Sequence, residues 1–210
     1  MANTNAPFGF RQSASLGASP TYEQIVVAIN YNAGAIFYGD PVTQQTDGSV
    51  AQSGSTGGAP APLGIAGIFT GCTYLSGAQK RTVWSNYWPG SDVASGNVVE
   101  GYIVNDPGAR FLVQADSSAT VWVAGANGTP ACIGNTVGFL IGTGNTSNGL
   151  SGAYLDNTTV STAANNPFRI VGVLNFPPGA NGTLANSASG AYTQFIVAFN
   201  NVNTKNLTGA

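Results

Sequence analysis

The sequence contains no histidine among its 210 residues. Histidine is the side chain that most often acts as a general base near neutral pH. Its absence removes Ser–His and Cys–His nucleophile pairs and imidazole metal sites. The eight carboxylates are isolated in sequence, and Asp40 and Asp106 each precede a proline, a context typical of turns. No glycine is followed by lysine, which excludes a P-loop. We therefore expect no catalytic residues, no cofactor and no metal site.

Charged residues are also scarce. They make up 7 % of the chain, against about 25 % in an average soluble domain, and the formal net charge is −2. The pair Lys80–Arg81 is the largest basic cluster, so we expect no nucleic-acid partner and no attachment to an anionic membrane. A surface with so little charge repels neighbouring molecules weakly, and near-zero net charge favours association.

Long apolar runs are also missing, and we do not expect the N-terminal residues to be a secretory signal. The longest apolar runs, such as Ile25–Ile29, are far shorter than the ~20 residues of a transmembrane helix. The first ten residues have neither a basic start nor an apolar core, so we expect synthesis in the cytoplasm. In that reducing compartment Cys72 and Cys132 are expected to be free thiols, although their spacing alone leaves a disulfide open.

Glycine is abundant, with 29 residues that interrupt short β-branched and aromatic runs. This pattern is typical of strands joined by tight turns, and no segment repeats apolar residues at helical spacing over about 11 residues. The sequence predicts an all-β fold, a sandwich or jelly-roll-like barrel of short antiparallel strands. The expected strands are Gln24–Asn30, Ala35–Tyr38, Leu63–Phe69, Thr82–Trp88, Val98–Val104, Phe111–Ala115, Thr120–Ala124, Thr136–Ile141, Phe168–Leu174 and Tyr192–Asn200.

The domain organisation is expected to be simple. Residues 1–20 show no periodicity and are predicted to form an extended N-terminal arm that adds little to the core. Residues 21–210 are predicted to form a single β-rich domain, because composition changes too little to mark a second one. Long polar loops are expected at residues 46–62, 142–149 and 177–190. The sequence has no internal repeat of fixed period.

One aromatic cluster has several possible roles. In the run VWSNYWPG, alternation places Trp84 and Trp88 on one face of a strand and Tyr87 on the other. These rings could fill the core, anchor a protein interface, or form a platform on which sugar rings stack.

The order of several short motifs resembles the head decoration, or cement, proteins of tailed bacteriophages. The resemblance covers most of the chain, and it depends on the order of the motifs rather than on any one of them. The motifs are Asn5–Arg11 (NAPFGFR), Tyr38–Val42 (YGDPV), Pro62–Phe69 (PLGIAGIF), Tyr87–Pro89 (YWP), Val104–Pro107 (VNDP), Arg110–Gln114 (RFLVQ), Phe168–Gly172 (FRIVG) and Val197–Asn201 (VAFNN).

The resemblance implies a structural virion protein that binds the outside of an icosahedral capsid and bridges neighbouring major capsid subunits. Such bridging raises the free energy of separating subunits under the pressure of packaged DNA, and many weak contacts add up through multivalency. The implied partners are the major capsid protein and other copies of this chain, in a dimer or a trimer. The arm is the expected capsid contact, with candidate residues Asn5, Ala6, Pro7, Phe8, Phe10 and Arg11.

A sugar-binding, lectin-like module on a virion or cell surface is the alternative. Exposed and coplanar Trp84 and Trp88 in a groove would favour it.

Overall fold

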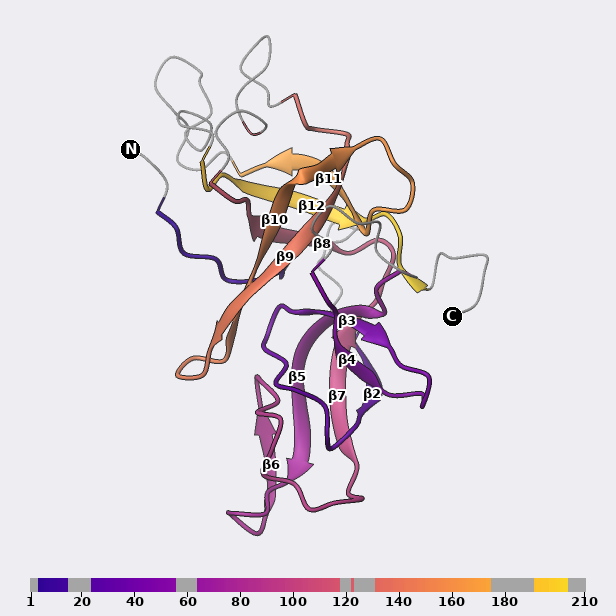
Figure 1. Ribbon diagram of the computed structural model, residues 1–210, viewed down its shortest axis with the longest axis vertical. Coiled ribbons are helices and arrows are strands. Elements are labelled where there is room, and N and C mark those ends of the chain that lie inside the picture. The colour runs from indigo at the N-terminus through magenta and orange to yellow at the C-terminus, as the bar shows by residue number, and fades with distance from the viewer. Residues whose placement is uncertain are drawn as a thin grey trace.

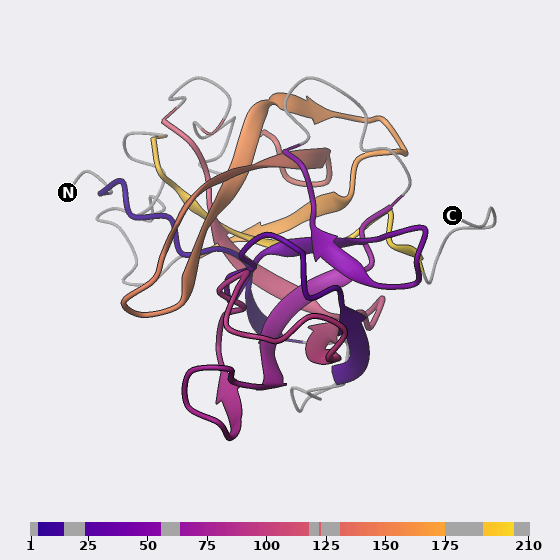
Figure 2. The same cartoon turned by 60° about the horizontal axis from the view of Figure 1, so that its bottom comes forward.

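The computed structural model describes residues 4–14, 24–55, 64–117, 122, 131–174 and 191–203. Within these ranges the chain forms two six-stranded sheets, which confirms the all-β prediction. Figure 1 shows them as two lobes, the lower one drawn largely from the first half of the chain and the upper one from the second half. Figure 2 shows the same lobes with the lower one turned toward the viewer.

The lower lobe is a closed barrel, here called the first barrel. The ring is completed by two contacts. Strand β3 pairs antiparallel with β5, and Ile29 of β2 pairs in parallel with Val50 of β4. A sixth strand lies outside the ring and pairs with β5. The strands are β2 (Gln24–Ile29), β3 (Pro41–Gln44), β4 (Val50–Gln52), β5 (Gly67–Leu75), the outer strand β6 (Thr82–Ser85), and β7 (Val99–Val104).

The upper lobe, here called the second barrel, curls in the same way. Its two ends meet where Ala115, just after β8, bridges Leu155 of β10 in parallel. The arm supplies an additional strand, which pairs antiparallel with β8. The strands are β1 (Arg11–Ala14), β8 (Arg110–Gln114), β9 (Thr136–Asn145), β10 (Leu150–Ser161), β11 (Phe168–Val173) and β12 (Gln194–Phe199).

The two barrels have the same topology. If β6 and β1 are set aside as additions, five strands remain in each barrel. We number these five strands 1 to 5 in chain order within each barrel. In both barrels strand 1 pairs with strand 5, strand 5 with strand 4, strand 4 with strand 2, and strand 2 with strand 3, and all these pairs are antiparallel. The third strand then meets the first in parallel. Each barrel thus has five strands, fewer than the eight of a jelly roll.

The pairing registers also agree around the whole ring. Both barrels carry a bulge at the same place, after Phe69 in β5 and after Ile170 in β11. The register defines equivalent residues, and the following equivalent pairs are buried in both barrels: Ile29 and Ala115, Val42 and Val137, Val50 and Leu155, Phe69 and Ile170, Ile103 and Val197. The connecting loops differ in length, which explains why the sequence shows no fixed period.

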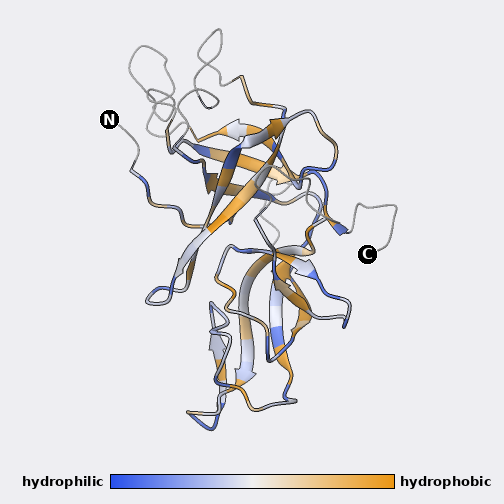
Figure 3. Ribbon diagram, in the orientation of Figure 1, coloured by the Kyte–Doolittle hydropathy of each residue, from blue (hydrophilic) through white to orange (hydrophobic). Residues whose placement is uncertain are grey.

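Each barrel encloses its own hydrophobic cluster, and the apolar strand residues are visible in Figure 3. The two clusters meet, because Ile68 of β5 and Val104 of β7 pack in the cluster of the second barrel. The hairpin between β9 and β10 also extends onto the first barrel. There Asn86 donates a hydrogen bond to the carbonyl of Asn148 over 2.7 Å, and the Tyr38 amide donates one to the carbonyl of Gly149 over 2.9 Å. The barrels are therefore joined by core packing and by backbone hydrogen bonds.

Most of the predicted strands are confirmed, with shifted ends. Residues 35–38 lie in the connection between β2 and β3 and form only isolated bridges, between Ile36 and Trp88 and between Tyr38 and Leu150. The expected strand at 120–124 lies almost wholly outside the described residues, as does the loop at 177–190.

Two predicted loops were wrong in part. The first, at 46–62, contains β4. The second, at 142–149, is strand as far as Asn145. Its glycines lie where the backbone passes close to neighbours: a Cβ at Gly144 would fall 2.2 Å from the ring of Phe37. In this segment glycine therefore reflects close packing within a strand and not a polar loop.

Candidate functional site

The arm and the junction between the barrels form the most distinctive site of the described structure. From Thr4 the arm runs along the second barrel to the middle of the molecule, where it enters β1 (Figure 1). There Arg11 pairs with Leu112 and Gln12 with Phe111 of β8, so the arm forms an edge strand of the second sheet. Of the predicted arm, residues 1–3 and 15–20 lie outside the described ranges, and Arg11–Ala14 is a strand.

The expectation that the arm adds little to the core was wrong, because Phe10 is 1 % exposed. Its ring stacks on Phe168 with centroids 4.3 Å apart and meets the edge of Phe139 at 6.1 Å. Burial of one phenylalanine side chain contributes about 1.5–3 kcal/mol. Phe10 is thus part of the second core and is not accessible to a partner.

The backbone beside Phe10 makes a close crossing with the first barrel. The Phe10 amide donates a hydrogen bond to the carbonyl of Gly39 over 2.9 Å. Gly9 and Gly39 both have positive φ, at 76° and 91°. A Cβ on Gly39 would fall 2.9 Å from the Phe10 nitrogen, and one on Gly9 would fall 2.6 Å from Cβ of Ser151. Only glycine fits these two positions without displacing the arm.

The buried carboxylate of Asp40, next to Gly39, also stabilises this junction. Asp40 is fully buried and accepts hydrogen bonds from the Ser151 hydroxyl at 2.5 Å, the Gln52 amide at 2.7 Å and the Phe37 backbone amide at 2.8 Å. Loss of hydration on burial raises the pKa of Asp40, while these three donors act in the opposite direction. The predicted turn role of Asp40 is confirmed by its bond to Phe37, and its bond to Ser151 also joins the two barrels.

Gln114, at the end of β8, anchors the start of the arm. Its side chain is 3 % exposed. It donates to the carbonyl of Thr4 over 3.0 Å and accepts from the amide of Ala6 over 3.0 Å. A third bond, 3.3 Å long, reaches the carbonyl of Tyr192. One side chain thus ties the arm and the segment before β12 to the same strand.

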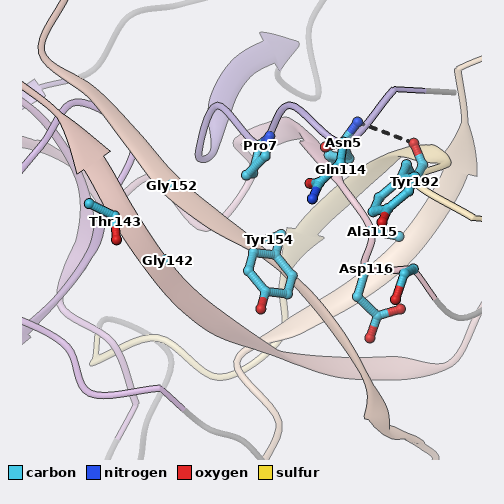
Figure 4. A pocket seen from close by; sticks show the side chains of 11 residues that line it. Asn5, Pro7, Gln114, Ala115, Asp116, Gly142, Thr143, Gly152, Tyr154 and Tyr192 are labelled. Atoms are coloured by element: carbon cyan, nitrogen blue, oxygen red, sulfur yellow. Dashed lines mark hydrogen bonds between the residues drawn. The ribbon is translucent and has the colours of Figure 1, made fainter. Parts of the chain in front are cut away.

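A pocket of about 290 Å³ lies between this part of the arm and the second barrel. Figure 4 shows Asn5 and Gln114 near Tyr192, with Tyr154 and Asp116 facing the same space. The Asp116 carboxylate accepts bonds from the Trp122 indole at 2.7 Å and from the backbone and side chain of Asn157 at 3.0 and 2.5 Å. Asp116 thus accepts hydrogen bonds from neutral donors, and these bonds hold the wall of the pocket in place.

The remaining arm residues are at least partly exposed. Asn5 and Ala6 are exposed, and Pro7 and Phe8 are half-buried. The guanidinium of Arg11 lies 4.7 Å from the centre of the Phe8 ring, and Arg11 itself is exposed. Of the predicted contact residues, all but Phe10 are thus at least partly accessible along one strip of the second barrel.

The predicted aromatic cluster is divided by the fold. Trp88 is fully buried and donates its indole hydrogen to the carbonyl of Ala33 over 3.1 Å, while Trp84 is 65 % exposed. The expectation that both tryptophans share a face was wrong because β6 ends at Ser85, and Trp88 lies beyond it, paired with Ile36 in an isolated bridge. Tyr87 stacks on Phe37 with centroids 5.4 Å apart.

Trp84 lies against β5 on the outer surface of the first barrel. A Cβ on Gly71 would meet its six-membered ring at 3.2 Å, so the ring covers the bare backbone of β5. Within the same sheet, Tyr102 pairs with Gly71 and hydrogen-bonds to Thr73 at 3.1 Å. Of the three cluster residues, Trp84 is exposed, Tyr87 is half-buried, and only Trp88 is closed to a partner.

Both cysteines are free thiols, as predicted, and both are buried. Cys72 belongs to the first core and Cys132 to the second. Burial raises the pKa of Cys72 to about 12 and that of Cys132 to about 11, so neither is a reactive thiolate at neutral pH.

The described ranges contain no group of three or more side chains able to hold a metal ion, and no helix in them could span a membrane. Comparisons of the chain with protein-family models, with curated proteins and with solved structures find no match.

Proposed function

We propose that this protein is a decoration protein on the outside of a bacteriophage capsid, where it stabilises the shell by bridging neighbouring major capsid subunits. In this proposal the mature protein is a virion component made in the cytoplasm of the host bacterium. Its partners are the capsid protein and further copies of itself.

The observation that carries the proposal is the meeting of four motifs of the resemblance at the arm junction. Phe10, in the Asn5–Arg11 motif, stacks on Phe168 of the Phe168–Gly172 motif. Its amide bonds Gly39 in the Tyr38–Val42 motif, and the Gly39 amide in turn bonds the carbonyl of Phe69, which ends the Pro62–Phe69 motif. Motifs far apart in sequence thus cooperate in one task, which is to fix the arm on the body.

An arm fixed in this way suits a bridging protein. Ordering a free segment on binding lowers affinity, and an arm already held in its extended form avoids much of that loss. The outer strip of Asn5, Ala6, Phe8 and Arg11 then offers polar, apolar and cationic groups in a set geometry. With a net charge of −2 and 7 % charged residues, the rest of the body can lie close to a neighbour without strong repulsion.

Attachment to shells assembled from the major capsid protein of the same phage tests the proposal. We expect the wild-type protein to co-sediment with these shells, and a Phe8→Ala/Arg11→Ala variant to bind at least tenfold more weakly although its melting temperature falls by no more than about 4 °C. A Lys80→Ala/Arg81→Ala variant removes exposed charge far from the arm and serves as the control. Absence of wild-type attachment, or equal attachment of the arm variant, would contradict the proposal.

The sugar-binding alternative required Trp84 and Trp88 side by side in a groove. Because Trp88 is buried and Trp84 is exposed, only a single ring is available. No observation on the described surface favours the alternative over the capsid role.

A further inference from the structure

The equivalence of the two barrels allows one sheet edge to be compared with its counterpart. In the second barrel, β12 lies on one side of β8, and two segments share the other side. Ala115, directly after β8, bridges Leu155, and the beginning of β8 is covered by β1, where Arg11 pairs with Leu112 and Gln12 with Phe111. The arm therefore covers the beginning of the β8 edge, and β10 meets the chain directly after its end.

The counterpart of β8 in the first barrel is β2. It pairs with β7 along its whole length on one side, and on the other side its last residue, Ile29, meets Val50 of β4. By register, Gln24–Val26 correspond to the residues of β8 that β1 covers. Within the described ranges no strand pairs with this part of β2, and Ile25 and Val26 are 37 % and 61 % exposed. Among the described residues, the first barrel thus has an open edge where the second has a covered one.

This edge lacks the features that normally prevent pairing. Natural edge strands are protected by charged side chains, proline, bulges or short length. The sequence QIVVAI of β2 has no charge and no proline, and its register with β7 runs without a bulge from Gln24 to Ile29. Over about five residues, a length of ~17 Å, the backbone groups that point away from β7 are consequently available for a further strand.

We propose that β2 pairs antiparallel with β2 of a second copy of this chain, across a two-fold axis near Val26. The β1–β8 pair shows the geometry that such an edge accepts: an extended segment running antiparallel. The arm of each copy is already bound to its own second barrel through Phe10, so it does not cover both edges. A two-fold contact needs only one open edge on each copy, and β2 is itself an extended, uncharged strand.

This pairing defines one of the two oligomeric states expected from the sequence, and it does not depend on attachment to a capsid. A contact built on one strand edge buries less area than a permanent dimer needs, so the dimer should dissociate on dilution. Because β2 carries no charge, its dissociation constant should be nearly independent of salt concentration.

Sedimentation of the purified full chain over a wide concentration series tests the proposal without any capsid. We expect a reversible monomer–dimer equilibrium, and we expect Val26→Lys to raise the dissociation constant at least tenfold. Val98→Lys is the matched control, because Val98 is 69 % exposed but lies outside the ladder of β2. Equal melting temperatures for the two variants show that both fold.

Hydrogen exchange identifies the surface involved. Those amides of Gln24–Ala28 that point away from β7 should become more protected as the concentration of wild-type protein rises, and those of the Val26→Lys variant should not. A protein that stays monomeric at every concentration, a dimer unaffected by Val26→Lys, equal weakening by Val98→Lys, or a dimer without this protection would each overturn the proposal.

Discussion

Replacement of Phe10 by alanine tests whether the arm is part of the fold. The ring is 1 % exposed, stacks on Phe168 at 4.3 Å and meets Phe139 edge-on at 6.1 Å. Removing such a ring leaves a cavity, and buried Phe→Ala changes cost about 3–5 kcal/mol. For a chain of this size, 1 kcal/mol corresponds to a melting-temperature change of about 2–4 °C. We therefore expect Phe10→Ala to lower the melting temperature by about 6–20 °C.

Phe8→Ala is the matched control, since it also removes a phenyl ring from the arm, two residues before Phe10. Phe8 is half-buried and contacts the exposed Arg11, so we expect a loss of no more than about 1 kcal/mol. Urea denaturation of both variants, followed by intrinsic fluorescence, gives the two free energies of unfolding. If Phe10→Ala were no more destabilising than Phe8→Ala, the packing of the arm into the second core would be refuted.

Three further predictions concern the junction and the thiols. Gln114→Ala removes three hydrogen bonds that hold the arm and the segment before β12. In urea denaturation it should cost about 1–3 kcal/mol, whereas Gln45→Ala at an exposed turn should cost almost nothing, and equal costs would contradict the anchoring role. Burial raises the pKa of Asp40 above 3.8, so the stability that its proton contributes is present below that value and is lost as pH rises through the raised pKa. As pH rises from 3.8 through the raised pKa, the contribution of Asp40 to the free energy of unfolding should therefore fall in the wild type, and Asp40→Asn should flatten that part of the profile; an unchanged slope would contradict the assignment. Because Cys72 and Cys132 are separate buried thiols, a reductant should not change the melting temperature, and a clear drop would indicate a disulfide.

Strands with β-branched or aromatic runs could be predicted from sequence, and β2, β7, β8 and β12 are examples. The strand β10 could not, because its sequence LSGAYLDNTTVS contains glycine, aspartate and asparagine, which usually favour turns. Long pairing with β9 stabilises it instead. Tertiary contacts of this kind outweigh local preference and leave no periodic signal.

The candidate site was only partly predictable for a related reason. The extended arm and its outward residues followed from the sequence, but the burial of Phe10 depends on Phe168 and Phe139, which are more than a hundred residues away. The anchoring role of Gln114 likewise depends on contacts distant in sequence. The glycines in PFGF and YGDP were the available signal, since Gly9 and Gly39 mark the close crossing of two backbones.

Cryo-electron microscopy of the virions whose genome encodes this chain tests the proposed role most directly. We expect density for two adjoining five-stranded barrels on the outer surface of the shell. The strip from Asn5 to Arg11 should lie against a capsid subunit, and each copy should contact more than one subunit. Virions that lack this density outside the shell, or that carry the protein only in the tail or the interior, would contradict it.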